Sequence, residues 1–213
     1  MFIKYLIDIF NRLFFNLTWS YFHTFFLVIE QPSKVANDIK NNRALPLPPE
    51  KYITSGIIYI FSIWSLRWYI FNIKLSLHNI IFAIIFALYI VVSIYLFGII
   101  VWTTGCRRKS IKYTVSAYTY IVGTFLPFVI IVNEILDIIN FKAGIFSNIT
   151  IISSLFILLT ALIGLQYIYR FLKIIHQIRP IRAILVFALF VVINYLVTEI
   201  FTYIIDYART IQI

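Results

Sequence analysis

The sequence predicts an all-α membrane protein with five transmembrane helices. Its 213 residues are 62% hydrophobic and only 12% charged, whereas soluble domains carry about a quarter charged residues. Five apolar stretches hold about 20 or more residues each, the length that a helix needs to cross a ~30 Å hydrocarbon core. None shows the two-residue alternation of a strand, so helices rather than a barrel are expected. The stretches cover residues 52–73, 80–103, 113–136, 149–169 and 183–205.

Lysine and arginine residues are unevenly distributed between alternate connections. Fourteen of the eighteen lie before the first stretch or in the connections after the second and fourth stretches. Cytoplasmic connections are enriched in these residues, so the N-terminus is predicted in the cytoplasm and the C-terminus outside. The net charge of +10 therefore reflects orientation in a cytoplasmic (inner or plasma) membrane, and nucleic acid is not an expected partner.

Residues 1–51 form the predicted cytoplasmic N-terminal segment, and residues 52–213 form the predicted five-helix transmembrane domain. Within residues 1–29 a polar residue recurs every fourth position: Lys4, Asp8, Arg12, Asn16, Ser20 and Thr24. This spacing places the polar residues on one face of a helix. We expect an amphipathic helix in the cytoplasmic interface or docked on the bundle, because a sixth span would carry the whole stripe through lipid.

Two short segments follow this helix. The sequence Gln31-Pro32-Ser33 is typical of a helix start, which predicts a short amphipathic helix over residues 33–42. Prolines 46, 48 and 49 then favour an extended connector into the first span, because proline disfavours helix in the residue before it.

Eight cations of the predicted cytoplasmic loops are the candidate lipid-binding or partner-binding residues. Each basic residue near an anionic leaflet contributes about 1 kcal/mol. Orientation alone accounts for such residues in most membrane proteins, and that alternative stays open. The eight are Arg107, Arg108, Lys109, Lys112, Arg170, Lys173, Arg179 and Arg182.

A second candidate site consists of ionisable residues within the apolar stretches or at their ends. Arg67, Glu134, Glu199 and Asp206 all fall toward the predicted outer boundary at the helical rise of 1.5 Å per residue. Ionisable groups at membrane depth are suspected functional residues, and these four could form an ion-binding or polar cluster. The alternative is that each is hydrated at the interface.

Several small or polar residues are expected to mediate helix contacts. Asn133, Asn194 and Thr198 are candidates for hydrogen bonds between helices. Gly123 with Pro127 indicates close packing followed by a kink, and the two remaining span glycines, Gly98 and Gly164, are interpreted as helix-contact positions.

The sequence offers no recognisable catalytic or metal-binding motif. Its three histidines have no His, Asp or Glu partner at ligand spacing, and its single cysteine, Cys106, cannot form an internal disulfide. No phosphate-binding glycine loop or nucleophile elbow is present. We therefore expect a protein that is not an enzyme and uses no metal or other cofactor.

Three segments resemble the Yip family (Ypt-interacting-protein domain), particularly its prokaryotic members. They are residues 24–51, the sequence GCRRKS at 105–110 followed by YTVSAY at 113–118 and Leu126-Pro127, and the hairpin at 165–183. The resemblance implies five spans, a cytoplasmic N-terminus and a non-enzymatic role in membrane organisation. The acidic-aromatic-Gly motif of eukaryotic members is absent, so an interaction with Rab-type GTPases is not carried over.

Together these features favour a membrane scaffold or adaptor that binds anionic lipid or a protein partner through its basic loops, alone or as a homo-oligomer. The alternative is a small transporter or ion-conducting subunit that uses the outer carboxylates. Five spans do not divide evenly into the inverted repeats of many secondary transporters. A scaffold predicts that loop neutralisation changes binding, whereas a transporter predicts that Glu134→Gln or Glu199→Gln abolishes a flux.

Overall fold

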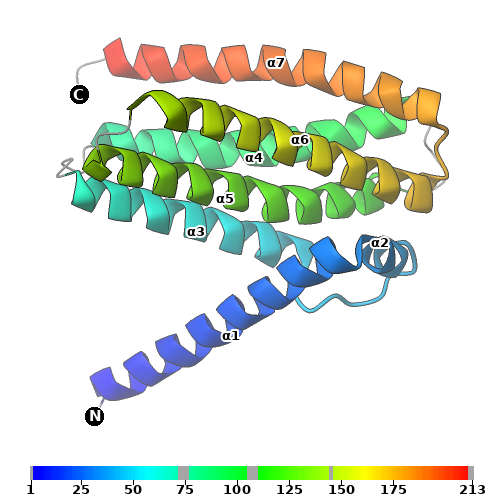
Figure 1. Cartoon of the computed structure of the whole chain (residues 1–213). Helices are drawn as coiled ribbons and strands as arrows, with labels where there is room; N and C mark the ends of the chain where they lie inside the picture. The colour runs from blue at the N-terminus through cyan, green and yellow to red at the C-terminus, as the bar shows by residue number, and fades with distance from the viewer. Residues whose placement is uncertain (1, 72–76, 105–109, 144–145, 211–213) are drawn as a thin grey trace.

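The computed structural model describes the backbone of residues 2–71, 77–104, 110–143 and 146–210, and the side chains of residues 15–71, 79–104, 110–139 and 151–207. These residues form seven helices joined by short connections, and no strand occurs among them. The helices are α1 (Phe2–Glu30), α2 (Pro32–Lys40), α3 (Pro49–Ile70), α4 (Leu77–Thr103), α5 (Ile111–Ala143), α6 (Phe146–His176) and α7 (Pro180–Thr210) (Figure 1).

Four helices are long and apolar enough to cross a membrane. Within the described residues they are Asn79–Thr103, Ile111–Ile139, Ile151–His176 and Pro180–Tyr207. The prediction of an all-α, multi-pass membrane protein is thereby confirmed. The first predicted span corresponds to α3, which is a helix but is not one of these four. Its serine, threonine, tyrosine and arginine side chains lower its hydropathy.

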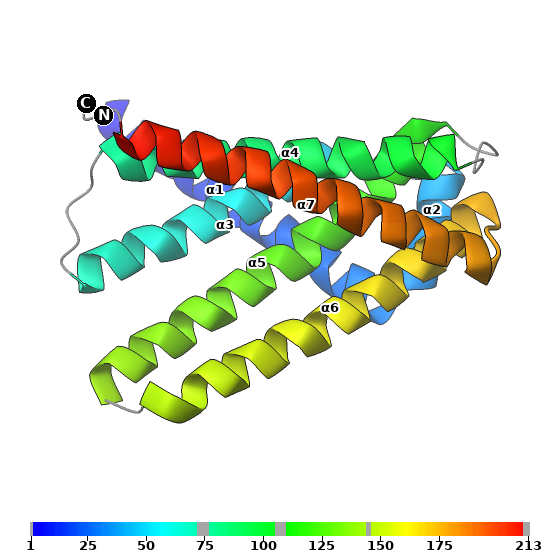
Figure 2. The same cartoon turned by 90° about the horizontal axis from the view of Figure 1, so that it is seen from above.

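Helices α3 to α7 run side by side, and the short helix α2 lies across one end of them (Figures 1 and 2). Helix α5 contacts α3, α4 and α6, while α7 packs on α4 and α2 packs on α6. The chain leaves α4 and α6 at the α2 end and enters α5 and α7 there. The opposite end of the bundle carries the C-terminal ends of α3, α5 and α7.

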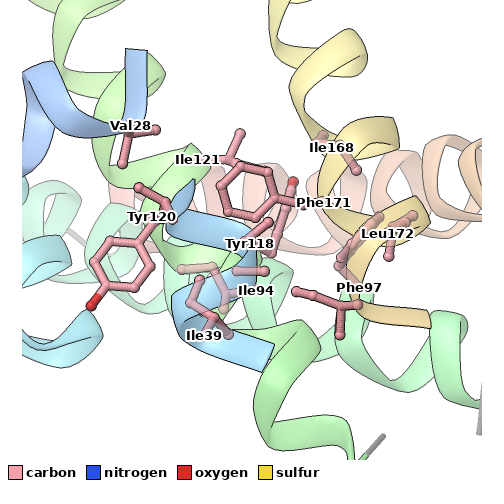
Figure 3. Close-up of a cluster of buried hydrophobic side chains, with 14 of the residues drawn as sticks. Val28, Ile39, Ile94, Phe97, Tyr118, Tyr120, Ile121, Ile168, Phe171 and Leu172 are labelled. Atoms are coloured by element: carbon pink, nitrogen blue, oxygen red, sulfur yellow. The ribbon is translucent and has the colours of Figure 1, made fainter. Parts of the chain in front are cut away.

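The interior is best packed at the α2 end, where α2, α4, α5 and α6 converge (Figure 3). Phe97 of α4 stacks on Tyr118 of α5 with 4.2 Å between ring centroids. Phe171 and Leu172 of α6 and Ile39 of α2 are buried in the same cluster. Burial of a large apolar side chain contributes about 1.5–3 kcal/mol where it leaves water, so this cluster fixes α2 on the bundle.

Helices α3 and α5 approach closely at a pair of glycines. A Cβ added at Gly123 would lie 2.8 Å from the ring of Tyr52, and one added at Gly56 would lie 2.9 Å from Cγ of Pro127. The Tyr52 hydroxyl also forms a 2.7 Å hydrogen bond with that of Thr124. The close packing predicted at Gly123 and Pro127 is confirmed.

The other two predicted contact glycines differ. A Cβ at Gly98 would lie 2.6 Å from Cγ2 of Val115, which confirms a close α4–α5 contact. No atom lies within 4 Å of a Cβ placed at Gly164. The prediction for Gly164 was wrong: this residue lines an apolar cavity of about 500 Å³ between α5–α6 and α4–α7, because α6 and α7 diverge along their length (Figure 2).

Helices α6 and α7 present largely apolar surfaces to their surroundings. Only 11% of the α6 span and 6% of the α7 span is buried within the protein. Exposed leucine and isoleucine side chains such as Leu158, Leu162, Ile184 and Ile200 cover these surfaces. Such large contiguous apolar faces are typical of lipid-facing helices.

Candidate functional site

Helix α2 is positioned by its sequence at both ends. Pro32 occupies its first turn, where the missing backbone N–H would have no helical partner. The helix start predicted at Gln31–Ser33 is confirmed, although no side chain caps it. After the helix, Asn42 adopts φ 55°, a left-handed conformation that asparagine tolerates. The chain then becomes non-helical until Pro49, as the proline-rich sequence predicts.

The two faces of α2 differ in chemistry. Val35, Ala36 and Ile39 are buried in the core, whereas Ser33, Asn37 and Lys40 line a cavity against α6. The polar residues recur at i, i+4 and i+7 and therefore lie on one helix face. The predicted short amphipathic helix is confirmed, and its polar face is directed at a neighbouring helix.

The cavity between α2 and α6 measures about 500 Å³. Helix α6 contributes Arg170, Lys173 and Ile174, and Gln177 follows directly after its end, so polar side chains of α2 and α6 oppose each other across the cavity. Its lining residues are Ser33, Asn37, Lys40, Arg170, Lys173, Ile174 and Gln177. We call this space the α2–α6 basic cavity.

Three of the seven lining residues are cationic and none is acidic. Arg170 and Lys173 are exposed, and Lys40 is half-buried. Among the described residues of this end, the salt bridge joins Arg43 to Asp38 at 3.8 Å, outside the cavity lining. The structure thus brings together two of the predicted binding residues, Arg170 and Lys173, with Lys40, a cation of the predicted N-terminal segment.

Two polar contacts hold the end of α6 beside the cavity, one of them exposed and the other buried. The Tyr167 hydroxyl donates a 2.7 Å hydrogen bond to the carbonyl oxygen of Ile29, at the end of α1. On the inner side of α6, Nε2 of His176 lies 2.6 Å from the Thr114 hydroxyl of α5. Both contacts involve residues distant in sequence, so they fix the end of α6 against α1 and α5.

The remaining predicted cations lie elsewhere at the same end. Lys112 is in the first turn of α5 and lines two cavities, of about 210 and 590 Å³, beside the proline-rich connector. Arg179 and Arg182 are exposed where α7 begins. Arg107, Arg108 and Lys109 lie outside the described residues.

The candidate cluster at the opposite end is centred on one salt bridge. Arg67 donates from Nη1 to Oε2 of Glu134 at 2.7 Å, and Nε1 of Trp64 donates to Oε1 of the same carboxylate at 3.0 Å. Asp137 lies 3.6 Å from Nη2 of Arg67. Glu134 is buried, and its negative charge is compensated by Arg67, while Trp64 donates a further hydrogen bond to the carboxylate.

The other two predicted members of this cluster, Glu199 and Asp206, lie on α7, whose main packing partner is α4. The structure therefore joins Arg67 to Glu134 and does not bring Glu199 into the same salt bridge.

Polar side chains join the helices at the predicted asparagines. Asn194 of α7 accepts from the Ser93 hydroxyl of α4 at 3.0 Å and donates to the Tyr89 hydroxyl at 2.8 Å. Thr198 lies 3.1 Å from the Tyr89 hydroxyl, and Asn133 of α5 accepts from Ser153 of α6. The predicted hydrogen bonds between helices are confirmed.

One contact was not anticipated from the sequence. Proline at position 127 has no N–H, so the carbonyl oxygen of Gly123 lacks its helical donor. The Tyr21 hydroxyl of α1 donates to this oxygen at 2.8 Å, and the Tyr21 ring stacks 4.9 Å from that of Tyr52. Pro127 was the available signal, because a proline inside a helix leaves the carbonyl four residues earlier in need of a donor.

Among the described residues, no group of three or more His, Cys, Asp or Glu side chains is placed to hold a metal ion. Comparison of the chain with protein-family models, curated proteins and solved structures gives no match.

Proposed function

We propose that this protein is a Yip-like scaffold or adaptor of the cytoplasmic membrane that recognises anionic lipid or an acidic protein partner at its basic end. It crosses the membrane five times, with its N-terminus in the cytoplasm and its C-terminus outside. The observation that carries this proposal is the docking of α2 across the end of the bundle where Lys112, Arg170, Lys173, Arg179 and Arg182 gather.

A fifth crossing by α3 is supported by its pairing with α5. Near its start Tyr52 contacts Thr124, and near its end Arg67 contacts Glu134. The two helices therefore run parallel, as two crossings separated by one intervening crossing, α4, must do. The 22 residues of α3 extend about 33 Å at 1.5 Å per residue, enough for the hydrocarbon core.

The packing and the exposed side chains of α1 support a helix that is docked on the bundle and also contacts lipid. Its second half packs on α3 and α5, with Tyr21, Thr24 and Val28 buried. Its outer face carries an exposed aromatic stripe, which consists of Phe15, Trp19, Phe22 and Phe26. Exposed tryptophan and phenylalanine on one helix face favour the boundary between headgroups and hydrocarbon.

The charge distribution supports recognition at the basic end over transport at the opposite end. Lys40, Arg170 and Lys173 share a cavity without a carboxylate in its lining. At the opposite end Glu134 is bonded to Arg67 and Trp64. An ion-binding carboxylate must exchange its partner for the ion, and this part-buried salt bridge opposes that exchange, because losing a charged hydrogen-bond partner costs about 1.5–3 kcal/mol.

The resemblance to the Yip family supports the proposed number of crossings and their orientation. It rests on the segments at residues 24–51, 105–118 and 165–183. The proposed five crossings and cytoplasmic N-terminus agree with that family, and the role of a non-enzymatic membrane organiser follows from the resemblance.

The proposal is tested by affinity purification of the tagged protein in mild detergent, with mass spectrometry of the proteins and lipids that co-purify. The test variant is R107Q/R108Q/K109Q, which removes three charges from a predicted cytoplasmic connection. The matched control is K74Q/K142Q/R209Q, which removes three charges from the predicted outer side. A reproducible partner protein or enriched anionic lipid that only the first variant loses supports the proposal.

The absence of any enriched protein or anionic lipid would overturn the proposal. The transporter alternative is examined with the same purified protein in proteoliposomes. A solute or ion flux that Glu134→Gln or Glu199→Gln abolishes, while the protein stays folded, would favour transport instead.

A further inference from the structure

We propose that the α2–α6 basic cavity binds the phosphate group of an anionic phospholipid. This inference rests on the proposed function and goes further, because it assigns the binding to one cavity with named lining residues and gives the chemical class of the ligand. Lys40, Arg170 and Lys173 would surround the phosphate, while Ser33 and Asn37 line the same cavity.

The chemistry of the lining residues is suited to phosphate. Three cations share about 500 Å³ with no acidic residue among the seven that line it. Like charges at such proximity repel, and a bound anion removes that repulsion. The Arg170 guanidinium can donate two parallel hydrogen bonds to phosphate oxygens, while the lysines act as point charges. The Ser33 hydroxyl and the Asn37 amide supply neutral donors.

The location of the cavity favours a lipid over a soluble phosphate compound. The apolar span of α6 ends at His176, so Arg170 and Lys173 occupy its last two turns. Lysine and arginine near the ends of membrane helices extend to the headgroup region. Helix α2 runs across the bundle end (Figure 1), which places its polar face at the same depth.

A path for the acyl chains leads away from the cavity. Ile174 is the apolar residue of the lining, and further along the same face of α6 the side chains of Ile163, Leu159 and Leu155 are exposed. Only 11% of this span is buried within the protein. A lipid with its phosphate in the cavity can therefore lay its chains on the open surface of α6.

The test is native mass spectrometry of the full-length protein in detergent micelles. The protein is titrated with dioleoylphosphatidylglycerol, with dioleoylphosphatidylcholine and with soluble sn-glycerol 3-phosphate. Each basic residue near an anionic lipid changes affinity about fivefold, so K40Q/R170Q/K173Q should weaken phosphatidylglycerol binding about a hundredfold. R170K should keep more of the affinity than R170Q, because it retains the charge and loses only the fork geometry.

The matched control is K34Q/R43Q/K51Q, which removes the same charge from exposed residues outside the cavity lining. Circular dichroism of each variant establishes that the helices are retained. A large loss in the cavity variant with a loss of less than about tenfold in the control supports the inference.

Three results would overturn it. An equal loss in both triple variants would mean that a diffuse basic surface attracts lipid, which leaves the proposed function standing. Binding of glycerol 3-phosphate as tight as that of the lipid would assign the cavity to a soluble phosphate compound. Equal affinity of the wild-type protein for phosphatidylcholine and phosphatidylglycerol would remove the anion requirement, while the co-purification experiment decides the proposed function separately.

Discussion

The hydrogen bond between Tyr21 and Gly123 makes a prediction that a double-mutant cycle can isolate. Tyr21→Phe removes the hydroxyl group and leaves the ring, which stacks on Tyr52. The Gly123 carbonyl oxygen then has neither a helical donor nor Tyr21, since Pro127 has no N–H. A buried polar group without a partner costs about 1–3 kcal/mol, so the free energy of unfolding should fall by about that amount.

The second substitution in the cycle is Pro127→Ala, which restores an N–H four residues after Gly123. In that background the carbonyl has a helical donor, so the Tyr21→Phe substitution should cost about 1 kcal/mol less than in the wild-type protein. The absolute stability of Pro127→Ala itself does not enter the comparison. This separation matters because Pro127 also packs on Gly56.

The assay is reversible unfolding in mixed micelles of a mild detergent and SDS, followed by far-ultraviolet circular dichroism. Tyr203→Phe is the control, because Tyr203 is exposed on α7 and its substitution should change stability by less than about 0.5 kcal/mol. An equal cost of Tyr21→Phe in the two backgrounds would refute the reasoning, as would no cost at all. Either result would mean that the Tyr21 hydroxyl does not replace the donor that Pro127 lacks.

Three further predictions concern the contacts between the spans. Gly123→Ala should destabilise the protein by about 1–3 kcal/mol because its Cβ would meet the Tyr52 ring at 2.8 Å, whereas Gly164→Ala has open space and should be tolerated; equal thermal unfolding of the two variants would contradict this difference. Glu134→Gln should lower the free energy of unfolding by about 1.5–3 kcal/mol, because Arg67 loses its 2.7 Å partner. Asp137→Asn should cost less than about 1 kcal/mol at this half-exposed position, and the reverse order in a denaturation assay would refute this assignment. Asn194→Leu should weaken the α4–α7 contact by about 1 kcal/mol, at ~0.6 kcal/mol for each of its two hydrogen bonds; an unchanged unfolding midpoint would contradict that role.

The helices could be predicted because lipid imposes a strong local constraint. A segment that crosses hydrocarbon must be long, apolar and internally hydrogen-bonded, and those properties are visible in residues 80–103 or 183–205 without any knowledge of neighbours. The predicted stretch 149–169 ended too early, because α6 continues to His176. Phe171, Leu172 and Ile175 are buried in the core that includes α2, while Arg170 and Lys173 remain exposed.

The tertiary contacts were less predictable because apolar helices offer many equivalent faces. Gly164 and Gly98 are both single glycines within apolar stretches, yet of these two only Gly98 contacts another helix. The α2–α6 basic cavity brings together Lys40 and Arg170, residues 130 positions apart, and the packing of α2 across the end of the bundle determines that proximity. A sequence pattern can indicate that a residue seeks a partner, as Pro127 does, but it does not identify Tyr21 as that partner.

The most direct test of the proposed architecture is cysteine accessibility across α3. In a C106S background, A44C lies before the helix and S76C lies after it, and each is treated with a membrane-impermeant maleimide in intact and permeabilised cells. Five crossings with a cytoplasmic basic end predict that S76C is labelled in intact cells and that A44C is labelled only after permeabilisation. Labelling of both residues from the same side would show that α3 does not cross, and the reversed pattern would place the α2–α6 basic cavity outside the cell.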